Sequence, residues 1–152
     1  MTLHPLASDT VSLKDKKEAI KVINSGIVTM NTYVRAVEKK FSNILKRYCL
    51  MVNSGSSANL LALSSFDFKK GSEIITPNLT FSTTVAPIYQ LGLVPYFVGV
   101  EKNKFIADPK HIEKCINKKT VALMIPNLLG NIADWKKINK IAKKYKLKII
   151  ED

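Results

Sequence analysis

The chain has 152 residues, 46% of them hydrophobic, and a formal net charge of +12 at pH 7. This length suffices for one domain with a core, and no apolar run approaches the roughly 18 residues that a membrane helix needs. The first ten residues lack a basic stretch followed by an apolar one, so we expect no signal peptide. Cys49 and Cys115 fit no metal-binding spacing, and we expect them to be free, buried thiols in a cytoplasmic protein.

The basic charge comes almost entirely from lysine. Lysine and arginine together number 24, and only Arg35 and Arg47 are arginines. Most lysines interleave with apolar residues, as in "DWKKINKIAKKYKLKII" (134–150), which is typical of a solvated helix face. A nucleic-acid surface would favour arginine and exposed aromatic residues, so we expect no nucleic-acid partner and no membrane partner. A general attraction for phosphorylated small molecules stays open.

Taken in chain order, the hydrophobic pattern alternates between helices and strands. It predicts helices at 13–24 and 34–47, a buried strand at 48–52, a helix at 56–66, a strand at 72–77, a helix at 82–91, a strand at 93–100, a helix at 107–116, a strand at 121–125, a helix that Asp134 caps and that runs through Tyr145, and a strand at 147–150. Such alternation predicts an α/β fold in three layers, a mostly parallel sheet with helices on both faces.

Ligands of open parallel sheets bind beyond the carboxyl ends of the strands, so the residues that follow each strand are the candidate site. They are expected to converge at one edge of the sheet, and they are Ser54 to Ser57, Asn78 to Phe81, Pro126 to Asn131, and Glu151 with Asp152.

The stretch "VNSGSSANLLAL" (52–63) has almost no side-chain bulk where a strand is expected to meet a helix. Free backbone N–H groups of a first helical turn, with the positive end of the helix dipole, bind anions. Small residues at Gly55, Ser56 and Ser57 would let a phosphate approach. The motif matches neither the dinucleotide fingerprint nor the P-loop, and an ordinary serine-capped helix start is the alternative.

Five short strings follow one another in a specific order: "NSGSSANLLAL", "TPNLTFSTTVAPI", "GLVPYFVGVE", "LLGN" and "IIED". This order resembles the DegT/StrS family of pyridoxal-phosphate (PLP) enzymes, the sugar aminotransferases of fold type I. The resemblance runs from about Gly26 to Asp152. The sequences of the motifs "NSGSSANLLA" and "TFSTTVAPIYQLGLVP" are most similar to a branch that includes CDP-4-keto-6-deoxyglucose 3-dehydratases. Asn127 departs from the pattern, because many relatives carry histidine there.

The resemblance implies roles for single residues in binding the cofactor. Gly55, Ser56 and Ser57 would hold the cofactor phosphate, and the ring of Phe81 would stack on the pyridine. Asp152 would pair with the pyridine nitrogen and keep it protonated, which makes it the catalytic candidate. Without the resemblance, an ordinary core aromatic residue is an equally good interpretation of Phe81. The alternative interpretation of Asp152 is a solvated strand end. No substrate-binding residue and no metal ligand is identified.

The resemblance also implies how the chain is organised. Residues 1–30 would form an N-terminal segment, and residues 31–152 an incomplete PLP-binding large domain, with the small C-terminal domain absent. The lysine that forms the Schiff base lies downstream of the aspartate in this family, so the chain reads as a truncated gene or fragment. We expect this fragment alone to be inactive.

Three functions remain open. The first is a PLP-dependent aminotransferase that acts on a nucleotide-linked keto sugar in polysaccharide or lipopolysaccharide biosynthesis, with glutamate as amino donor and a homodimeric assembly. The second is a nucleotide-sugar 3-dehydratase of the same family, in which a histidine replaces the lysine. The third is a non-catalytic basic domain that binds anions or nucleic acid.

Overall fold

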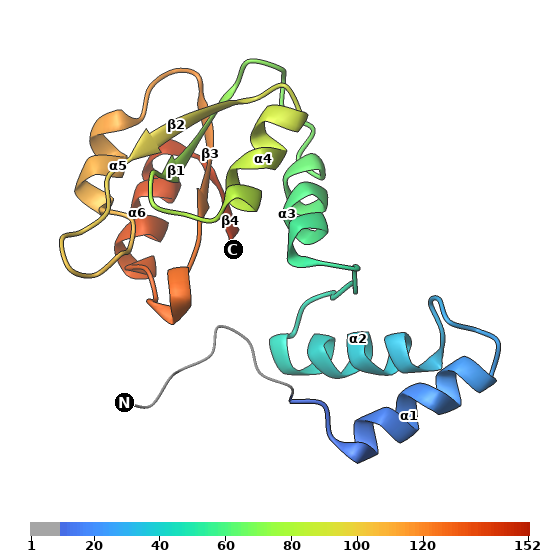
Figure 1. Ribbon diagram of the computed structural model, residues 1–152. Coiled ribbons are helices and arrows are strands. Elements are labelled where there is room, and N and C mark those ends of the chain that lie inside the picture. Colours follow the sequence, from blue (N-terminus) through green and yellow to red (C-terminus); the bar gives the residue numbers. More distant parts are fainter. Residues whose placement is uncertain (1–9) are drawn as a thin grey trace. The chain divides into compact units, whose positions relative to one another are not determined.

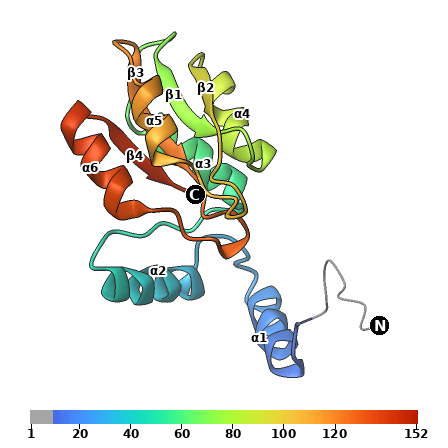
Figure 2. The same cartoon turned by 90° about the vertical axis from the view of Figure 1, so that its left-hand side faces the viewer.

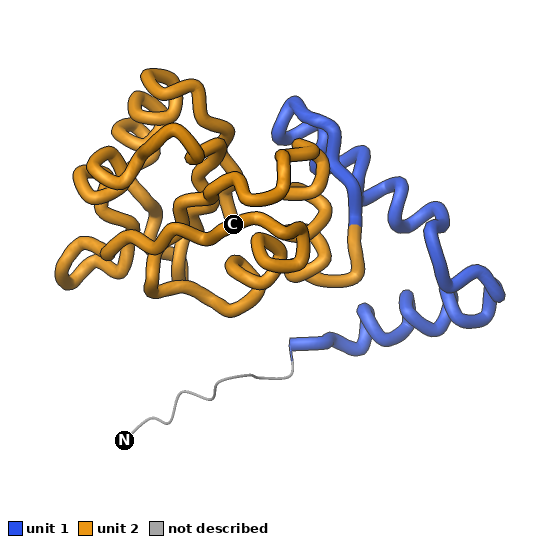
Figure 3. Tube along the Cα trace, turned by 90° about the horizontal axis from the view of Figure 1, so that it is seen from above, with its two compact units in different colours: residues 1–51 blue, residues 52–152 orange. Residues whose placement is uncertain are grey.

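The structure, a computed structural model, describes residues 10–152 and divides into two compact units, residues 1–51 and 52–152 (Figure 3). The first nine residues of the predicted segment 1–30 lie outside the described part. The boundary at residue 30 stays a prediction, because it refers to the architecture of a complete family member.

The first unit contains two helices, α1 (Leu13–Asn24) and α2 (Thr32–Leu45), close to the predicted ranges. Helix α1 begins at a capping box formed by Ser12 and Asp15. Helix α2 begins at Asn31, whose side chain accepts a hydrogen bond from the amide of Tyr33, and ends at Lys46 in a left-handed conformation. Neither helix buries a residue fully, since both expose their apolar stripes.

The predicted buried strand at 48–52 is wrong. Tyr48 is fully exposed, Leu50 is 72% exposed, and no described strand pairs with this segment. Its amides instead bond to side chains of α2: Cys49 N–H donates to Ser42 Oγ at 3.1 Å, and Met51 N–H donates to Glu38 Oε1 at 2.9 Å. An apolar run becomes a strand only where a neighbouring strand takes up its N–H and C=O groups, and none does so here.

The second unit is built on four strands, β1 (Glu73–Pro77), β2 (Val94–Val98), β3 (Thr120–Ile125) and β4 (Lys148–Glu151). Their order is β2-β1-β3-β4, and all neighbouring pairs are parallel. Helices α3 (Gly55–Ser64) and α4 (Ser82–Gln90) cover one face, and α5 (Pro109–Cys115) and α6 (Trp135–Tyr145) cover the other (Figures 1 and 2). The predicted three-layer α/β fold is therefore confirmed.

Alternation along the strands divides the core into two clusters. Successive strand residues point to opposite faces of a sheet, so neighbours in sequence join different clusters. The α3/α4 cluster contains Leu63, Ile74, Ile88, Leu93, Ala122, Met124 and Ile150. The α5/α6 cluster contains Ile75, Val98, Ala107, Ile112, Leu123, Ile125, Ala133, Ile138, Ile141 and Ala142.

Some details differ from the sequence prediction. Strand β2 is an edge strand, so Val94 and Phe97 are about half exposed rather than buried. A short 3-10 helix, Leu128–Gly130, was not predicted. Both cysteines are free as expected, but they are only partly buried. Among residues 10–152, no helix has both the length and the apolar character needed to cross a membrane.

Candidate functional site

Two carboxylates lie at the end of β4, that of Glu151, its last residue, and that of Asp152, which follows it. The register of the strand decides which of them faces α3 and α4. Ile150 lies in the α3/α4 cluster, while Ile149 packs against the α5/α6 cluster. Continuing this alternation places Glu151 on the α5/α6 side and Asp152 on the α3/α4 side. The contacts agree, because Asp152 Oδ2 accepts a hydrogen bond from the Thr84 hydroxyl of α4, whereas Glu151 Oε1 accepts one from Asn127 Nδ2 at 2.6 Å.

The backbone of Asp152 is held by the strand next to it and by Asn127. Its N–H donates to the carbonyl of Ile125 at 3.1 Å, and its C=O accepts from the amide of Asn127 at 2.8 Å. The Asn127 side chain in turn accepts from Ala133 N–H at 3.0 Å and from Trp135 Nε1 at 3.1 Å. Asn127 therefore connects the end of β4 with the start of α6, a role that the sequence pattern did not reveal.

The small-residue turn forms the N-terminus of α3, although residues 10–53 before it contain no strand. Ser54 is the N-cap, and its Oγ accepts from Ser57 N–H and donates to Ser57 Oγ, both at 3.1 Å. The amides of Gly55 and Ser56 have no partner among the described residues. A Cβ built on Gly55 would meet nothing within 4 Å, so space beside the turn is open. Two free N–H groups and two serine hydroxyls can thus take an anion.

Phe81 is the N-cap of α4 and makes no capping hydrogen bond with its side chain. Its side chain is 68% exposed, so it is not a core aromatic residue of this unit. The Phe81 carbonyl accepts from Thr84 N–H at 3.1 Å. One helical turn therefore connects the exposed ring to the residue that binds Asp152.

Two further observations connect these pieces. Asn59 of α3 is 6% exposed and donates from Nδ2 to the carbonyl of Thr83 at 3.3 Å, which ties α3 to the first turn of α4. The hydroxyls of Thr76 and Thr80 are buried without a partner in the described chain. Thr76 shares the α3/α4 face with Ile74, and an unsatisfied buried hydroxyl costs about 1–3 kcal/mol.

The ends of α3, α4 and β4 thus converge at one edge, beside the chain terminus in Figures 1 and 2. Thr84 of α4 connects Phe81 with Asp152. Asn59 connects α4 with α3, the helix that begins at the turn with Ser56 and Ser57. Among residues 10–152, no hydrogen bond joins two of the predicted site residues directly, apart from those within the turn itself. Their roles toward a cofactor stay predictions.

A groove between α5 and α6 is the competing anion site. Its lining includes Lys110, Lys137, Lys140, Lys144 and Glu113. Hydrogen bonds from Lys137 and Lys144 lower the pKa values of the carboxyls of Asp134 and Glu113, and these ion pairs are exposed. Two of the four lysines are thereby already neutralised, and the groove offers neither a free helix N-terminus nor a buried unpaired polar group among the described residues.

This unit belongs to the class of open α/β folds whose ligands bind at the carboxyl ends of the parallel strands, and at that edge it presents an open helix N-terminus, an exposed ring and an anchored carboxylate. The chain belongs to the DegT/DnrJ/EryC1/StrS aminotransferase family, whose sequence profile matches residues 10–152. The members similar to this chain include sugar aminotransferases and nucleotide-sugar 3-dehydratases.

Two curated relatives represent these two activities. A GDP-4-keto-6-deoxy-D-mannose 3-dehydratase of Yersinia pseudotuberculosis is 37% identical over an alignment of 155 positions. The alignment covers 97% of this chain and 39% of the relative. A dTDP-3-amino-3,6-dideoxy-alpha-D-galactopyranose transaminase of Aneurinibacillus thermoaerophilus is 35% identical over 133 residues, 87% of this chain and 37% of the relative. The chain thus spans about two fifths of the length of these relatives.

Solved structures agree with the fold. The structure of the E. coli GDP-4-keto-6-deoxy-D-mannose-3-dehydratase with bound hydrated PLP is 36% identical and has a TM-score of 0.91. It is matched over 100% of this chain and 41% of its own. The similarity therefore places the described fold within the PLP-dependent aminotransferase fold.

Ser54→Ala and Ser56→Ala separate stability from anion binding at the α3 turn. Ser54→Ala removes the N-cap and is expected to lower the free energy of unfolding by about 1 kcal/mol. Ser56→Ala removes a hydroxyl that makes no hydrogen bond within the described chain, so we expect unchanged stability and weaker phosphate binding. Urea denaturation and a phosphate-ligand titration of both variants measure this. Equal stability losses in the two variants would contradict the assignment of the cap.

Proposed function

We propose that this chain is the cofactor-binding part of a PLP-dependent enzyme that acts on a nucleotide-linked keto sugar. The observation that carries the proposal is the Asp152 carboxylate, anchored by Thr84 on the same face of the sheet as the open N-terminus of α3. PLP enzymes need these two features at a fixed separation, an anion site for the phosphate and a carboxylate for the ring nitrogen. Membership of the family supports the same cofactor.

The residues would divide the work of binding as follows. The amides of Gly55 and Ser56, with the hydroxyls of Ser56 and Ser57, would take the phosphate. The exposed ring of Phe81 would pack on one face of the pyridine, where stacking contributes about 0.5–1.5 kcal/mol beyond burial. Asp152 would hold a proton on the pyridine nitrogen by charge pairing. When bound, the cofactor supplies an electron sink for the substrate carbon next to the amine.

We propose aminotransfer from glutamate as the reaction of the enzyme, with a nucleotide-diphospho-keto-hexose as acceptor. The net charge of +12 suits such an anionic substrate. A homodimer, a cytoplasmic location, and the assignment of residues 31–152 to one large domain belong to the same proposal. The test is a steady-state assay of the whole enzyme that contains this chain, with glutamate and a nucleotide-linked keto sugar as substrates. Turnover with free amino acids and keto acids alone would contradict the sugar substrate.

A 3-dehydratase is the second candidate, and a specific observation favours it. GDP-4-keto-6-deoxy-D-mannose 3-dehydratases are 37% and 36% identical to this chain over nearly its whole length, slightly above the 35% of the transaminase. Reading the gene past codon 152 distinguishes the two reactions. A lysine at the position of the Schiff-base residue supports aminotransfer, and a histidine there supports dehydration.

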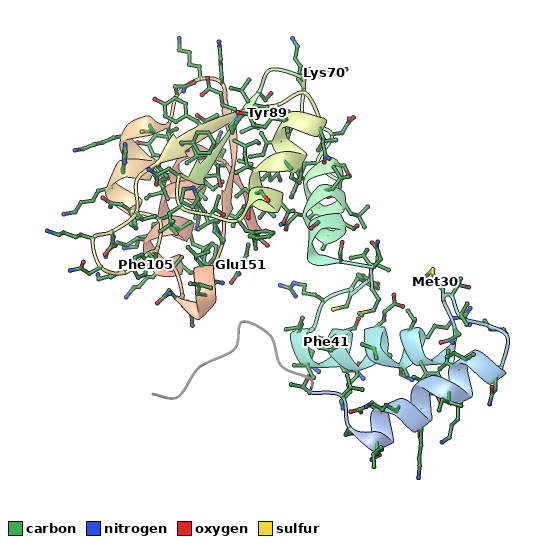
Figure 4. The ribbon with its side chains drawn as sticks, in the orientation of Figure 1. Met30, Phe41, Lys70, Tyr89, Phe105 and Glu151 are labelled. Atoms are coloured by element: carbon green, nitrogen blue, oxygen red, sulfur yellow. The ribbon has the colours of Figure 1, made fainter. Side chains whose placement is uncertain are left out.

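Phe81→Leu tests the stacking role. The substitution keeps apolar bulk but removes the aromatic face, so binding of pyridoxamine 5′-phosphate should weaken by about 2- to 10-fold. This ligand has no aldehyde, so it cannot condense with lysine side chains. The chain has 22 of them, since two of its 24 basic residues are arginines. Phe105→Leu is the matched control, since Phe105 is 52% exposed on the loop between β2 and α5 (Figure 4). An equal loss in both variants would argue against stacking by Phe81.

A further inference from the structure

We infer that Thr84 is a positioning residue that orients the Asp152 carboxylate toward the pyridine nitrogen, an inference that rests on the function proposed above. Thr84 has no exposed surface, yet its hydroxyl reaches out of α4 to donate to Asp152 Oδ2. This hydrogen bond joins two side chains that lie 68 residues apart in sequence.

The bond leaves one oxygen of the carboxylate available. Within the described residues, only Oδ2 of the Asp152 side chain has a hydrogen-bond partner, and Oδ1 has none. A carboxylate with one oxygen anchored loses most of its rotational freedom about both side-chain torsions. Its second oxygen then points in a fixed direction, which is what pairing with a ring N–H requires. Asp152 is an exposed residue, so without the hydrogen bond from Thr84 its carboxylate would rotate in solvent.

Threonine at this position is restrained by the helix around it. In a helix a threonine hydroxyl commonly bonds back to the carbonyl three or four residues earlier, but this hydroxyl bonds instead to Asp152, just after β4. Thr84 lies in the same first turn as Phe81, whose carbonyl accepts its amide hydrogen at 3.1 Å. The first turn of α4 therefore places both the ring and, through Thr84, the carboxylate, so their spacing is set by one rigid element.

The test uses the 152-residue chain and the ligand pyridoxamine 5′-phosphate. Thr84→Val, which keeps the shape but loses the hydroxyl, should weaken binding about tenfold, because a hydrogen bond to a charged group is lost. Thr84→Ser should restore affinity to within about threefold. In the background of Asp152→Ala, Thr84→Val should change affinity less than about twofold, since contacting residues couple in a double-mutant cycle.

A purely structural role for Thr84 would not produce this pattern. A cofactor analogue in which CH replaces the ring nitrogen should bind wild-type and Thr84→Val chains equally, and NMR of the ligand-free chain should show a slowly exchanging Thr84 hydroxyl proton that Asp152→Ala abolishes. Equal ligand affinities of Thr84→Val and wild type, or additive effects in the cycle, would overturn the inference while leaving the proposed function intact. Absence of any binding by the wild-type chain would instead contradict the proposed function itself, and the inference with it.

Discussion

Asp152→Ala should weaken binding of pyridoxamine 5′-phosphate to the chain by about 10- to 100-fold. A hydrogen bond to a charged partner contributes about 1.5–3 kcal/mol, and every 1.4 kcal/mol corresponds to a tenfold change in affinity. The register of β4 turns this carboxylate to the α3/α4 face, where the Thr84 hydroxyl anchors it. Isothermal titration calorimetry at constant ionic strength measures the change directly.

Glu151→Ala is the matched control for this substitution. Glu151, which is labelled in Figure 4, carries the same charge one residue away. Its side chain bonds to Asn127 on the opposite face of the sheet. We expect its removal to leave the affinity within about twofold, because the lost charge is exposed and screened. A larger loss from Glu151→Ala than from Asp152→Ala would show that the register argument assigns the wrong carboxylate.

Leu123→Ala should lower the free energy of unfolding by about 2–5 kcal/mol, the range for truncating a fully buried leucine. Leu123 has no exposed surface in the centre of the sheet and packs in the α5/α6 cluster, where the lost methyl groups leave a cavity. Leu129→Ala removes the same atoms from a side chain that is 91% exposed. It should change the stability by less than about 0.5 kcal/mol.

Chemical denaturation of both variants, followed by far-UV circular dichroism, measures this difference. The result also concerns the site, since the backbone of Asp152 is held by Ile125 at the end of β3 and by Asn127 two residues further on. If the two leucine variants lost equal stability, the three-layer packing described above would not be the fold of this chain in solution.

The helices of the second unit were predictable because their signals are local. Asp108 followed by Pro109 marks the start of α5, and Asp134 caps α6 as its position before an amphipathic run indicates. The segment at 48–52 failed for the opposite reason. Its apolar run resembles a strand, but strand formation depends on a partner, and no described strand lies beside it.

The site was predictable only in outline. The rule that ligands bind at the carboxyl ends of parallel strands selected the edge where α3, α4 and the end of β4 come together, and the resemblance selected Phe81 and Asp152 as its candidate residues. The contact of Thr84 with Asp152 and that of Asn127 with Glu151 were not predicted, because each joins segments far apart in sequence. One signal was nevertheless present, since alternation from the buried Ile150 already placed Asp152 on the face that α3 and α4 cover.

The central claim is that the N-terminus of α3, the first turn of α4 and the end of β4 form one cofactor site. A titration of isotopically labelled chain with pyridoxamine 5′-phosphate, followed by ¹H–¹⁵N NMR, tests it most directly. We predict saturable shift changes at the amides of Gly55, Ser56, Phe81 and Asp152. Shift changes confined to the α5/α6 groove around Lys110 would contradict the claim, because they would show that the ligand is attracted only by lysine charge.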